Sequence, residues 1–123
     1  MSVDLMQPPT NEAVRTALSW FAEELRSRYG DRLTGLHLFG SRARGDFKPF
    51  SDVDVAVILE NGAESLDGRM DLYNLAYDIL VETGAEIQPW PFSTREWADP
   101  SASESPALLR SLKRDSQPVW VRR

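Results

Sequence analysis

The sequence predicts an α/β protein in which a small mixed sheet of three to five strands carries helices mainly on one face. Segments with apolar residues at helical spacing alternate along the chain with short segments rich in β-branched and apolar residues. Glycine, serine or proline marks most of the boundaries between them, as expected where helices begin and end. Apolar residues make up 41% and charged residues 27% of the chain, which is typical of a globular domain.

The first predicted helix covers residues 11–30, NEAVRTALSWFAEELRSRYG. Gly30 stands where a C-cap is expected, because glycine readily adopts the backbone conformation that ends a helix. Four apolar residues recur at helical spacing and should form the inner face: Val14, Leu18, Phe21 and Leu25.

Two strands and a short connection follow this helix. The segment RLTGLHLFG, residues 32–40, predicts a strand of about six residues that ends at Gly40. SRARG predicts a tight turn or short helix with Ser41 at its start. SDVDVAVILE, residues 51–60, predicts a second strand, because it is β-branched and apolar after its two aspartates.

The second long helix is predicted over residues 69–84, RMDLYNLAYDILVETG, after a loop at residues 61–68. Gly84 should close it. Four residues at helical spacing are expected on its inner side, so that both tyrosines belong to the core: Met70, Tyr73, Tyr77 and Leu80.

The C-terminal third predicts two more strands and two short helical segments. AEIQPWPF, residues 85–92, should lie at a sheet edge or end in a bulge, because its prolines cannot donate ladder hydrogen bonds. STREW has the pattern of a capping box, with Ser93 at the cap and Glu96 three residues later. ESPALLRSLKRD predicts a helix with Pro106 in its first turn, and PVWV predicts a short final strand.

Length and composition limit the function classes. A chain of 123 residues predicts one domain over residues 1–123. No apolar run approaches the roughly 20 residues of a membrane span. The N-terminus lacks the pattern of a signal peptide and the chain has no cysteine, so a cytoplasmic protein without a membrane partner is expected. The net charge of −5 argues against non-specific nucleic-acid binding.

The sequence LFGSRARGDFKPFSDVDVAVIL, residues 38–59, contains the most informative pattern. Residues i and i+2 of a strand point to the same side, so Asp52 and Asp54 should project together, with Ala56 and Ile58 continuing their face. Two neighbouring carboxylates repel each other unless a cation lies between them. A lone Asp-x-Asp is often only a cap and a surface charge, but this pair heads an apolar strand.

A metal-bound triphosphate fits this arrangement. Mg²⁺ binds through carboxylates together with substrate phosphates. Gly40 allows close approach of the backbone to a ligand, and the Ser41 hydroxyl with nearby amides can hold phosphate oxygens. Arg42 and Arg44 can neutralise phosphate charge. The segment is neither a Walker loop nor a Rossmann fingerprint, because the glycine spacing of both is absent.

The pattern Gly40-Ser41, ten residues, then Asp52-x-Asp54 resembles the signature of the DNA polymerase β-type nucleotidyltransferase superfamily. Within it, the segment is most similar to the minimal nucleotidyltransferases (MNT proteins), which are often the antitoxin half of HEPN/MNT pairs. The resemblance is strong over residues 33–59 and weaker over residues 84–92. It implies the polymerase β-type nucleotidyltransferase fold.

The resemblance also implies a third carboxylate on a neighbouring strand, for which Glu86 is the best candidate. Glu82 and Asp78 are competitors, but both lie on the predicted helix, and Glu86 itself has the alternative of being a surface residue at a strand end. In the resembling enzymes two divalent metals, here Mg²⁺ with Mn²⁺ as the alternative, bridge the carboxylates and the nucleotide. Glu86 would bind the catalytic metal and accept the proton of the attacking group.

The implied reaction transfers a nucleoside monophosphate, AMP from ATP in the first instance, to a hydroxyl of another molecule. The implied acceptor is a tyrosine of a HEPN-type toxin, which makes the chain an antitoxin. The alternatives are an antitoxin that only masks its partner, an antibiotic nucleotidyltransferase, and an enzyme acting on an RNA end. Another nucleoside triphosphate as donor, and homo- or hetero-oligomers, remain open.

Two further groups of residues receive structural interpretations. His37, the only histidine, lies mid-strand and is expected to be a packed or hydrogen-bonded residue of the sheet rather than a catalyst. Lys48 precedes the aspartates and is expected to be solvated. Trp90, Trp97 and Trp120 are expected mostly in the core, with part of them on a contact surface.

Overall fold

The computed structural model describes residues 3–62 and 66–123. The loop predicted at residues 61–68 lies partly outside the described residues, and its last three residues belong to the following helix. The elements in chain order are α1 Asn11–Tyr29, the 3₁₀ turn η1 Gly30–Arg32, β1 Leu33–Phe39, α2 Ser41–Arg44, β2 Val53–Leu59, α3 Leu66–Thr83, β3 Ile87–Ser93, α4 Thr94–Ala98, the 3₁₀ turn η2 Pro100–Ala102, α5 Pro106–Asp115 and β4 Gln117–Val121.

The four strands form one mixed sheet in the order β3-β2-β1-β4. β1 is antiparallel to both β2 and β4, and β2 is parallel to β3. The strand with Pro89 and Pro91 therefore lies at an edge, as its missing amide donors predict. The final strand predicted from PVWV lies at the opposite edge.

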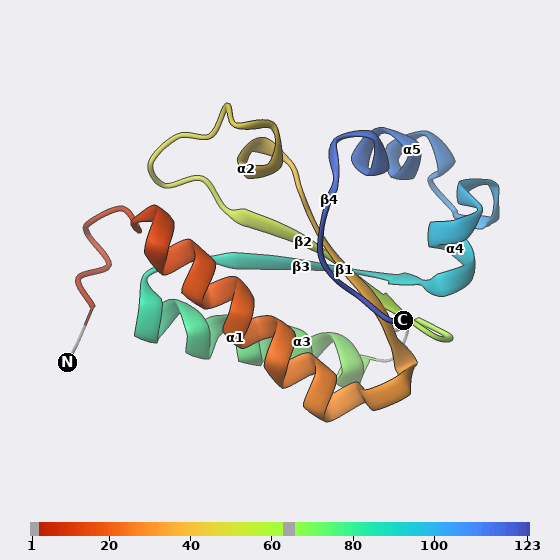
Figure 1. The fold of residues 1–123 in the computed structure, drawn as a ribbon, viewed down its shortest axis with the longest axis horizontal. Helices are drawn as coiled ribbons and strands as arrows, with labels where there is room; N and C mark the ends of the chain where they lie inside the picture. Colours follow the sequence, from red (N-terminus) through yellow and green to blue (C-terminus); the bar gives the residue numbers. More distant parts are fainter. Residues whose placement is uncertain (1–2, 63–65) are drawn as a thin grey trace.

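The long helices α1 and α3 cover one face of the sheet, and the short helices α4 and α5 lie on the other (Figure 1). The predicted α/β class, mixed sheet and main helical face are confirmed. The side chains of the first face form a large buried cluster with Val53, Val55, Val57 and Leu59 of β2. A smaller cluster on the second face contains Ala56 and Ile58 of β2. We call these two sides of the sheet the closed face and the open face.

The predicted inner side of α3 is wrong. Tyr77 is 65% exposed and Tyr73 is 47% exposed, whereas the buried residues of the helix lie on a different stripe. The stripe that packs between α1 and the sheet consists of Leu72, Leu75, Ala76 and Ile79. Both stripes are apolar at helical spacing, so periodicity alone does not separate them. Aliphatic side chains fill the interface without a polar atom, whereas a buried tyrosine hydroxyl needs a hydrogen-bond partner.

The predicted caps at Gly30 and Ser93 are confirmed. Gly30 follows α1 with a φ of 53°, and its N–H donates to the carbonyl of Arg26. Ser93 caps α4 in a complete capping box: its Oγ accepts from the Glu96 N–H at 3.0 Å, and the Glu96 carboxylate accepts from the Ser93 N–H at 3.2 Å. This box turns the chain from the edge strand β3 onto the open face. In the part of the chain that the structure describes, no helix has the length and apolarity needed to cross a bilayer.

Candidate active site

The two aspartates of the Asp-x-Asp pattern stand at the start of β2. Asp52 immediately precedes the strand and Asp54 is its second residue. Asp54 has the same parity along the strand as Ala56 and Ile58, which belong to the open-face cluster, while the valines between them belong to the closed-face core. The predicted division of this strand into two faces is confirmed, and it places a carboxylate on the less covered side of the sheet.

Glu86 lies beside Asp52 because β2 and β3 run parallel. Each of these residues immediately precedes its strand, and the Val53 N–H donates to the Glu86 carbonyl at 2.8 Å. A hydrogen bond with the Asp52 carboxyl is the main cause that raises the pKa of Glu86 above its ordinary value of 4.5, with burial and repulsion by Asp52 adding to it. Both side chains are exposed to solvent, so a cation that binds there can reach both carboxyls.

Asp54 lies deeper and is held from both sides. The Trp90 Nε1–H donates to Asp54 Oδ1 at 3.3 Å. Gly40, with a φ of 75°, lies against Oδ2 so closely that any Cβ at this position would overlap it. Burial raises the pKa of Asp54 above 3.8 and repulsion by Asp52 adds to this, while the bond from Trp90 and the charge of Arg44 oppose it.

The chemistry of these carboxylates fits a hard divalent cation. Burial raises the pKa of Asp54, and a hydrogen bond with Asp52 raises the pKa of Glu86, while repulsion by Asp52 adds to both. A bound cation would relieve this repulsion. Oxygen-only ligands suit Mg²⁺. Within residues 3–62 and 66–123, no three His, Cys, Asp or Glu side chains already have the spacing of a metal site. The structure brings Asp52 together with Glu86 and places Asp54 against Gly40 and Trp90.

The turn between β1 and β2 begins at Gly40 and continues as the single-turn helix α2. Ser41 is the first residue of α2, as predicted for a turn or short helix. The backbone N–H groups of Ala43 and Arg44 donate to the Gly40 carbonyl, at 3.2 and 3.1 Å. Because Gly40 also touches Asp54, the turn and the carboxylates lie next to each other. The binding of phosphate by Gly40 and Ser41 stays a prediction.

The two arginines of the turn have protein partners that the sequence did not indicate. Arg42 Nε donates to the Ser51 carbonyl at 3.0 Å, and its guanidinium lies 4.5 Å from the ring centroid of Phe47. Arg42 therefore holds the loop that leads to Asp52. Burial is the main cause that lowers the pKa of Arg42, and the charge of Asp52 opposes it.

Arg44 forms ion pairs with Asp46 at 3.3 Å and with Asp115 at 4.0 Å. Its side chain is more exposed than that of Arg42 and would have to leave weak surface pairs to reach a phosphate. The prediction that both arginines neutralise phosphate charge stays open, with Arg44 the less constrained of the two.

His37 is a packed residue, as expected. Its ring stacks on Trp97 with centroids 4.7 Å apart and an interplanar angle of 29°. Burial lowers the pKa of His37, and the nearby Lys113 lowers it further, so the neutral ring is favoured. Trp97 and Trp120 are half-buried, whereas Trp90 is 42% exposed. The contact between Trp90 and Asp54 escaped sequence reasoning, because the register of β3 against β2 creates it.

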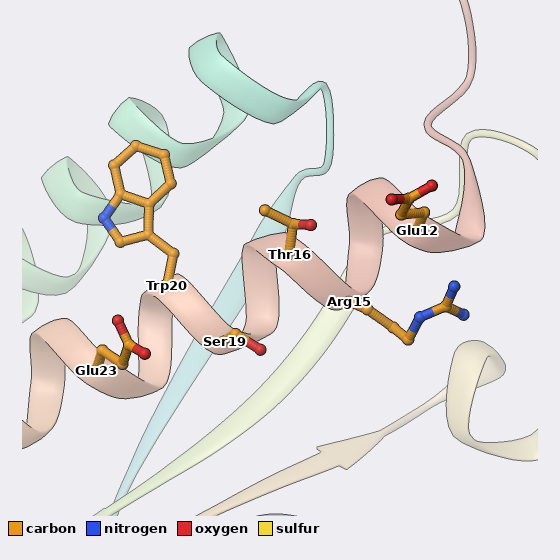
Figure 2. Close-up of a pocket in the computed structure, with 6 residues that line it drawn as sticks. All are labelled: Glu12, Arg15, Thr16, Ser19, Trp20 and Glu23. Carbon is orange, nitrogen blue, oxygen red and sulfur yellow. The ribbon is translucent and has the colours of Figure 1, made fainter.

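The surface has several hollows, and only some of them are lined by predicted site residues. One of about 490 Å³ runs along α1 and is lined by residues of that helix alone, with none of the predicted site residues among them (Figure 2). Glu86 borders a hollow of about 220 Å³. Gly40, Arg44 and Trp90 border another of about 190 Å³. Glu86 thus borders one small hollow, and Asp54 contacts Gly40 and Trp90, which border another.

Comparison with known proteins adds the family. The sequence matches the nucleotidyltransferase domain family over residues 18–109. The chain belongs to this nucleotidyltransferase family. The matched span includes the Gly-Ser turn, both aspartates and Glu86, and it confirms the predicted nucleotidyltransferase resemblance, while the narrower MNT assignment stays a prediction.

Curated relatives of this nucleotidyltransferase come from Methanocaldococcus jannaschii. "Putative protein adenylyltransferase MJ1305" is 37% identical over 65 residues, which cover 53% of the present chain and 42% of that protein. "Putative protein adenylyltransferase MJ0604" is 40% identical over 75 residues, which cover 58% of the present chain and 72% of that protein. The aligned part is thus less than half of the first relative and about three quarters of the second.

Solved structures share the fold of this nucleotidyltransferase. A structure described as a toxin-antitoxin with AMP-PNP superposes with a TM-score of 0.58 at 17% identity, over 84% of this chain and 73% of the other. A nucleotidyltransferase from Sulfolobus solfataricus, described as putative, gives a TM-score of 0.51 at 19% identity, over 92% of this chain and 90% of the other. At such identities the likeness concerns the fold alone.

Proposed function

We propose that this nucleotidyltransferase transfers AMP from ATP, or the corresponding unit of another nucleoside triphosphate, to a hydroxyl group of a partner protein. The observation that carries the proposal is the meeting of Asp52 with Glu86, and of Asp54 with Gly40, at one end of the sheet. The names of the curated relatives support a protein as acceptor. The toxin-antitoxin structure with AMP-PNP supports an adenine nucleotide as donor and an antitoxin role.

The reaction forms one bond and breaks one. The acceptor oxygen attacks the α-phosphorus, the new O–P bond forms, the bond from the α-phosphorus to the bridging oxygen breaks, and pyrophosphate leaves. The proton of the acceptor hydroxyl passes to a carboxylate, for which Glu86 is proposed because it lies beside Asp52 at the start of the neighbouring strand.

Asp52, Asp54 and Glu86 are proposed to hold two divalent ions, with Mg²⁺ as the first candidate and Mn²⁺ as the alternative. Such ions, when bound, neutralise charge that develops on the phosphates and lower the pKa of the acceptor hydroxyl. Trp90 and Gly40 orient the Asp54 carboxylate, one by donating to it and the other by leaving room for it. Ser41 is proposed to donate to a phosphate oxygen.

The proposed acceptor is a tyrosine of a HEPN-type toxin. A tyrosine hydroxyl stands at the end of a long rigid ring and can reach a shallow site, such as the small hollow that Glu86 borders. Its ordinary pKa of about 10 is within reach of a bound cation. The modified toxin would lose its activity, which makes the chain an antitoxin.

A second candidate function is inhibition by masking alone. The observation that favours it is the exposed apolar stripe on the outside of α3, which the fold leaves uncovered. A surface of this kind binds another protein without any chemistry at the carboxylates. The stripe consists of Met70, Tyr73, Tyr77 and Val81.

Intact-mass spectrometry separates the two functions. The chain is mixed with a HEPN-type protein, ATP and Mg²⁺, and the partner is expected to gain the mass of one AMP unit on a tyrosine. The Glu86→Gln variant should bind the partner and leave its mass unchanged, while the matched control Glu82→Gln, an exposed carboxylate of α3, should retain transfer. If the wild type neutralises the partner without a mass change, and the Asp52→Asn/Asp54→Asn variant does so equally well, masking is the function.

A further inference from the structure

The hollow that Gly40 and Trp90 border lies on the open face of the sheet beside the carboxylates. Its position follows from the strand register. Phe39 of β1 is paired with Asp54, and Trp90 of β3 is paired with Ala56 two residues further along β2. All four side chains therefore project from the same face.

The walls of this hollow are mainly apolar and flat. Phe39 and Trp90 meet edge to face, with centroids 5.9 Å apart and planes at 71°. Leu108 and Leu112 of α5 complete the lining. Trp90 is 42% exposed and Leu108 is 58% exposed, so the fold leaves apolar surface uncovered at this point. Such surface favours a flat aromatic ligand, because stacking against an aromatic side chain is favourable for any base.

Polar groups mark the mouth of the hollow. Gly40 and Arg44 come from the turn, and Ser111 and Asp115 come from α5. The same Trp90 that forms a wall also donates to Asp54. A ligand in the hollow would therefore extend directly toward the turn and the carboxylate.

The hollow is large enough for part of a nucleotide but too small for a whole one. Its volume of about 190 Å³ is below the roughly 300–1,000 Å³ of pockets that enclose a whole drug-sized ligand. It has room for a ring system while the rest of the ligand lies outside.

We infer that this hollow binds the nucleobase of the nucleoside triphosphate, with Trp90 and Leu108 as its main contacts. The inference rests on the proposed function and extends it, because it assigns the base to a site formed by this chain alone. Arg44 and Asp115 in the lining already pair with each other at 4.0 Å, so the site should hold purine bases mainly through stacking and discriminate little between adenine and guanine.

Isothermal titration calorimetry with Mg²⁺ tests the inference by comparing ATP with inorganic tripolyphosphate, which has no base. The wild type should bind ATP at least tenfold more tightly, a difference of about 1.4 kcal/mol. Trp90→Leu should remove most of this preference. Trp90→Phe keeps a ring but loses the N–H that binds Asp54, and it should keep the preference. The ratio of the two dissociation constants is used because any change at the carboxylates affects both ligands.

Leu108→Ala should weaken ATP binding by about threefold, because it removes apolar contact area. Val121→Ala, at a residue that is 49% exposed and outside the hollow, is the matched control and should change nothing. Equal affinity of the wild type for ATP and tripolyphosphate, or an equal loss of both in Trp90→Leu, would overturn the base site and leave the proposed function standing. No Mg²⁺-dependent binding of either ligand to the wild type would overturn both.

Discussion

The closed and open faces of the sheet are built from alternate residues of the same strands, yet they differ in cover and in chemistry. On the closed face, Val53, Val55 and Val57 of β2 are fully buried beneath the two long helices. On the open face, the intervening positions begin with carboxylates and end with Ala56 and Ile58, and only short helices cover them (Figure 1).

This difference shows how a small domain can hold a destabilising site. Crowded carboxylates with raised pKa values oppose folding at neutral pH. They are tolerated here because the closed face supplies most of the apolar burial, one residue away along the same strand. Alternate residues of β2 therefore face the buried core and the carboxylate site. Substitutions on the closed face should change stability, and substitutions on the open face should change ligand binding.

The largest expected effect is on the closed face. Leu25→Ala, at a fully buried position of α1, should lower the free energy of unfolding by about 3–5 kcal/mol. Leu109→Ala, equally buried but on α5, should cost less, about 2–3 kcal/mol, because the smaller cluster around it can collapse into the space. Urea denaturation of both variants measures the difference. Equal losses would show that the two faces contribute alike to stability.

The Asp52→Asn/Asp54→Asn variant should lose ligand binding without losing stability. Without ligand its stability should equal or exceed that of the wild type, because two repelling charges are removed. ATP with Mg²⁺ should raise the wild-type stability, by about 2.7 kcal/mol when the ligand is at 100 times its dissociation constant, and the variant should lose this gain. Thermal melts with and without ligand provide the measurement, with Asp78→Asn on the exposed side of α3 as control. Equal stabilisation of wild type and variant by ATP and Mg²⁺ would contradict a metal site at Asp52 and Asp54.

Two serines allow a matched test of binding against stability. Ser41→Ala should weaken nucleotide binding by about 1.5–3 kcal/mol, the usual cost of losing a hydrogen bond to a charged group, without unfolding the domain. Ser93→Ala removes the cap of α4 and should instead lower stability by about 1 kcal/mol with unchanged nucleotide affinity. Calorimetry and urea denaturation of the same two variants give both quantities. A Ser41→Ala variant with full nucleotide affinity would place the phosphates elsewhere.

The smallest expected effect is a dependence on pH. A carboxyl whose pKa is raised by folding contributes its full stability only below its unfolded pKa, and this contribution is lost as the pH rises through the folded pKa. For Glu86 the loss begins near 4.5 and extends above it, because folding raises its pKa. The advantage of Glu86→Gln over the wild type in the ligand-free protein should therefore grow between pH 4 and pH 7.

Urea denaturation across that pH range measures this advantage, and Glu82→Gln, an exposed residue of α3, should show no such growth. A constant difference between Glu86→Gln and the wild type at every pH would mean that Glu86 is not part of the crowded group.

Much of the fold is predictable from the sequence because the signals are local. Helix ends follow from residues with special backbone preferences, such as Gly30, and from the reciprocal bonds of Ser93 and Glu96. The alternating faces of β2 follow from the two-residue period of a strand. Glu86 is predicted from the family resemblance and from its place at the head of its strand, and the parallel pairing of β2 with β3 puts it beside Asp52.

Only the tertiary structure decided between alternatives that are locally equivalent. α3 has two apolar stripes at the same spacing, and packing against α1 and the sheet buried the aliphatic one that contains Leu72 and Ile79. Arg42 donates to the backbone carbonyl of Ser51 in the loop before β2. Trp90 of β3 donates to Asp54 of the neighbouring strand β2. The sequence by itself determined the elements and the carboxylate pattern, because spacing and caps act within a few residues. The facing of α3 and the partners of Asp54 depend on the register of segments far apart in the chain, which no local pattern contains.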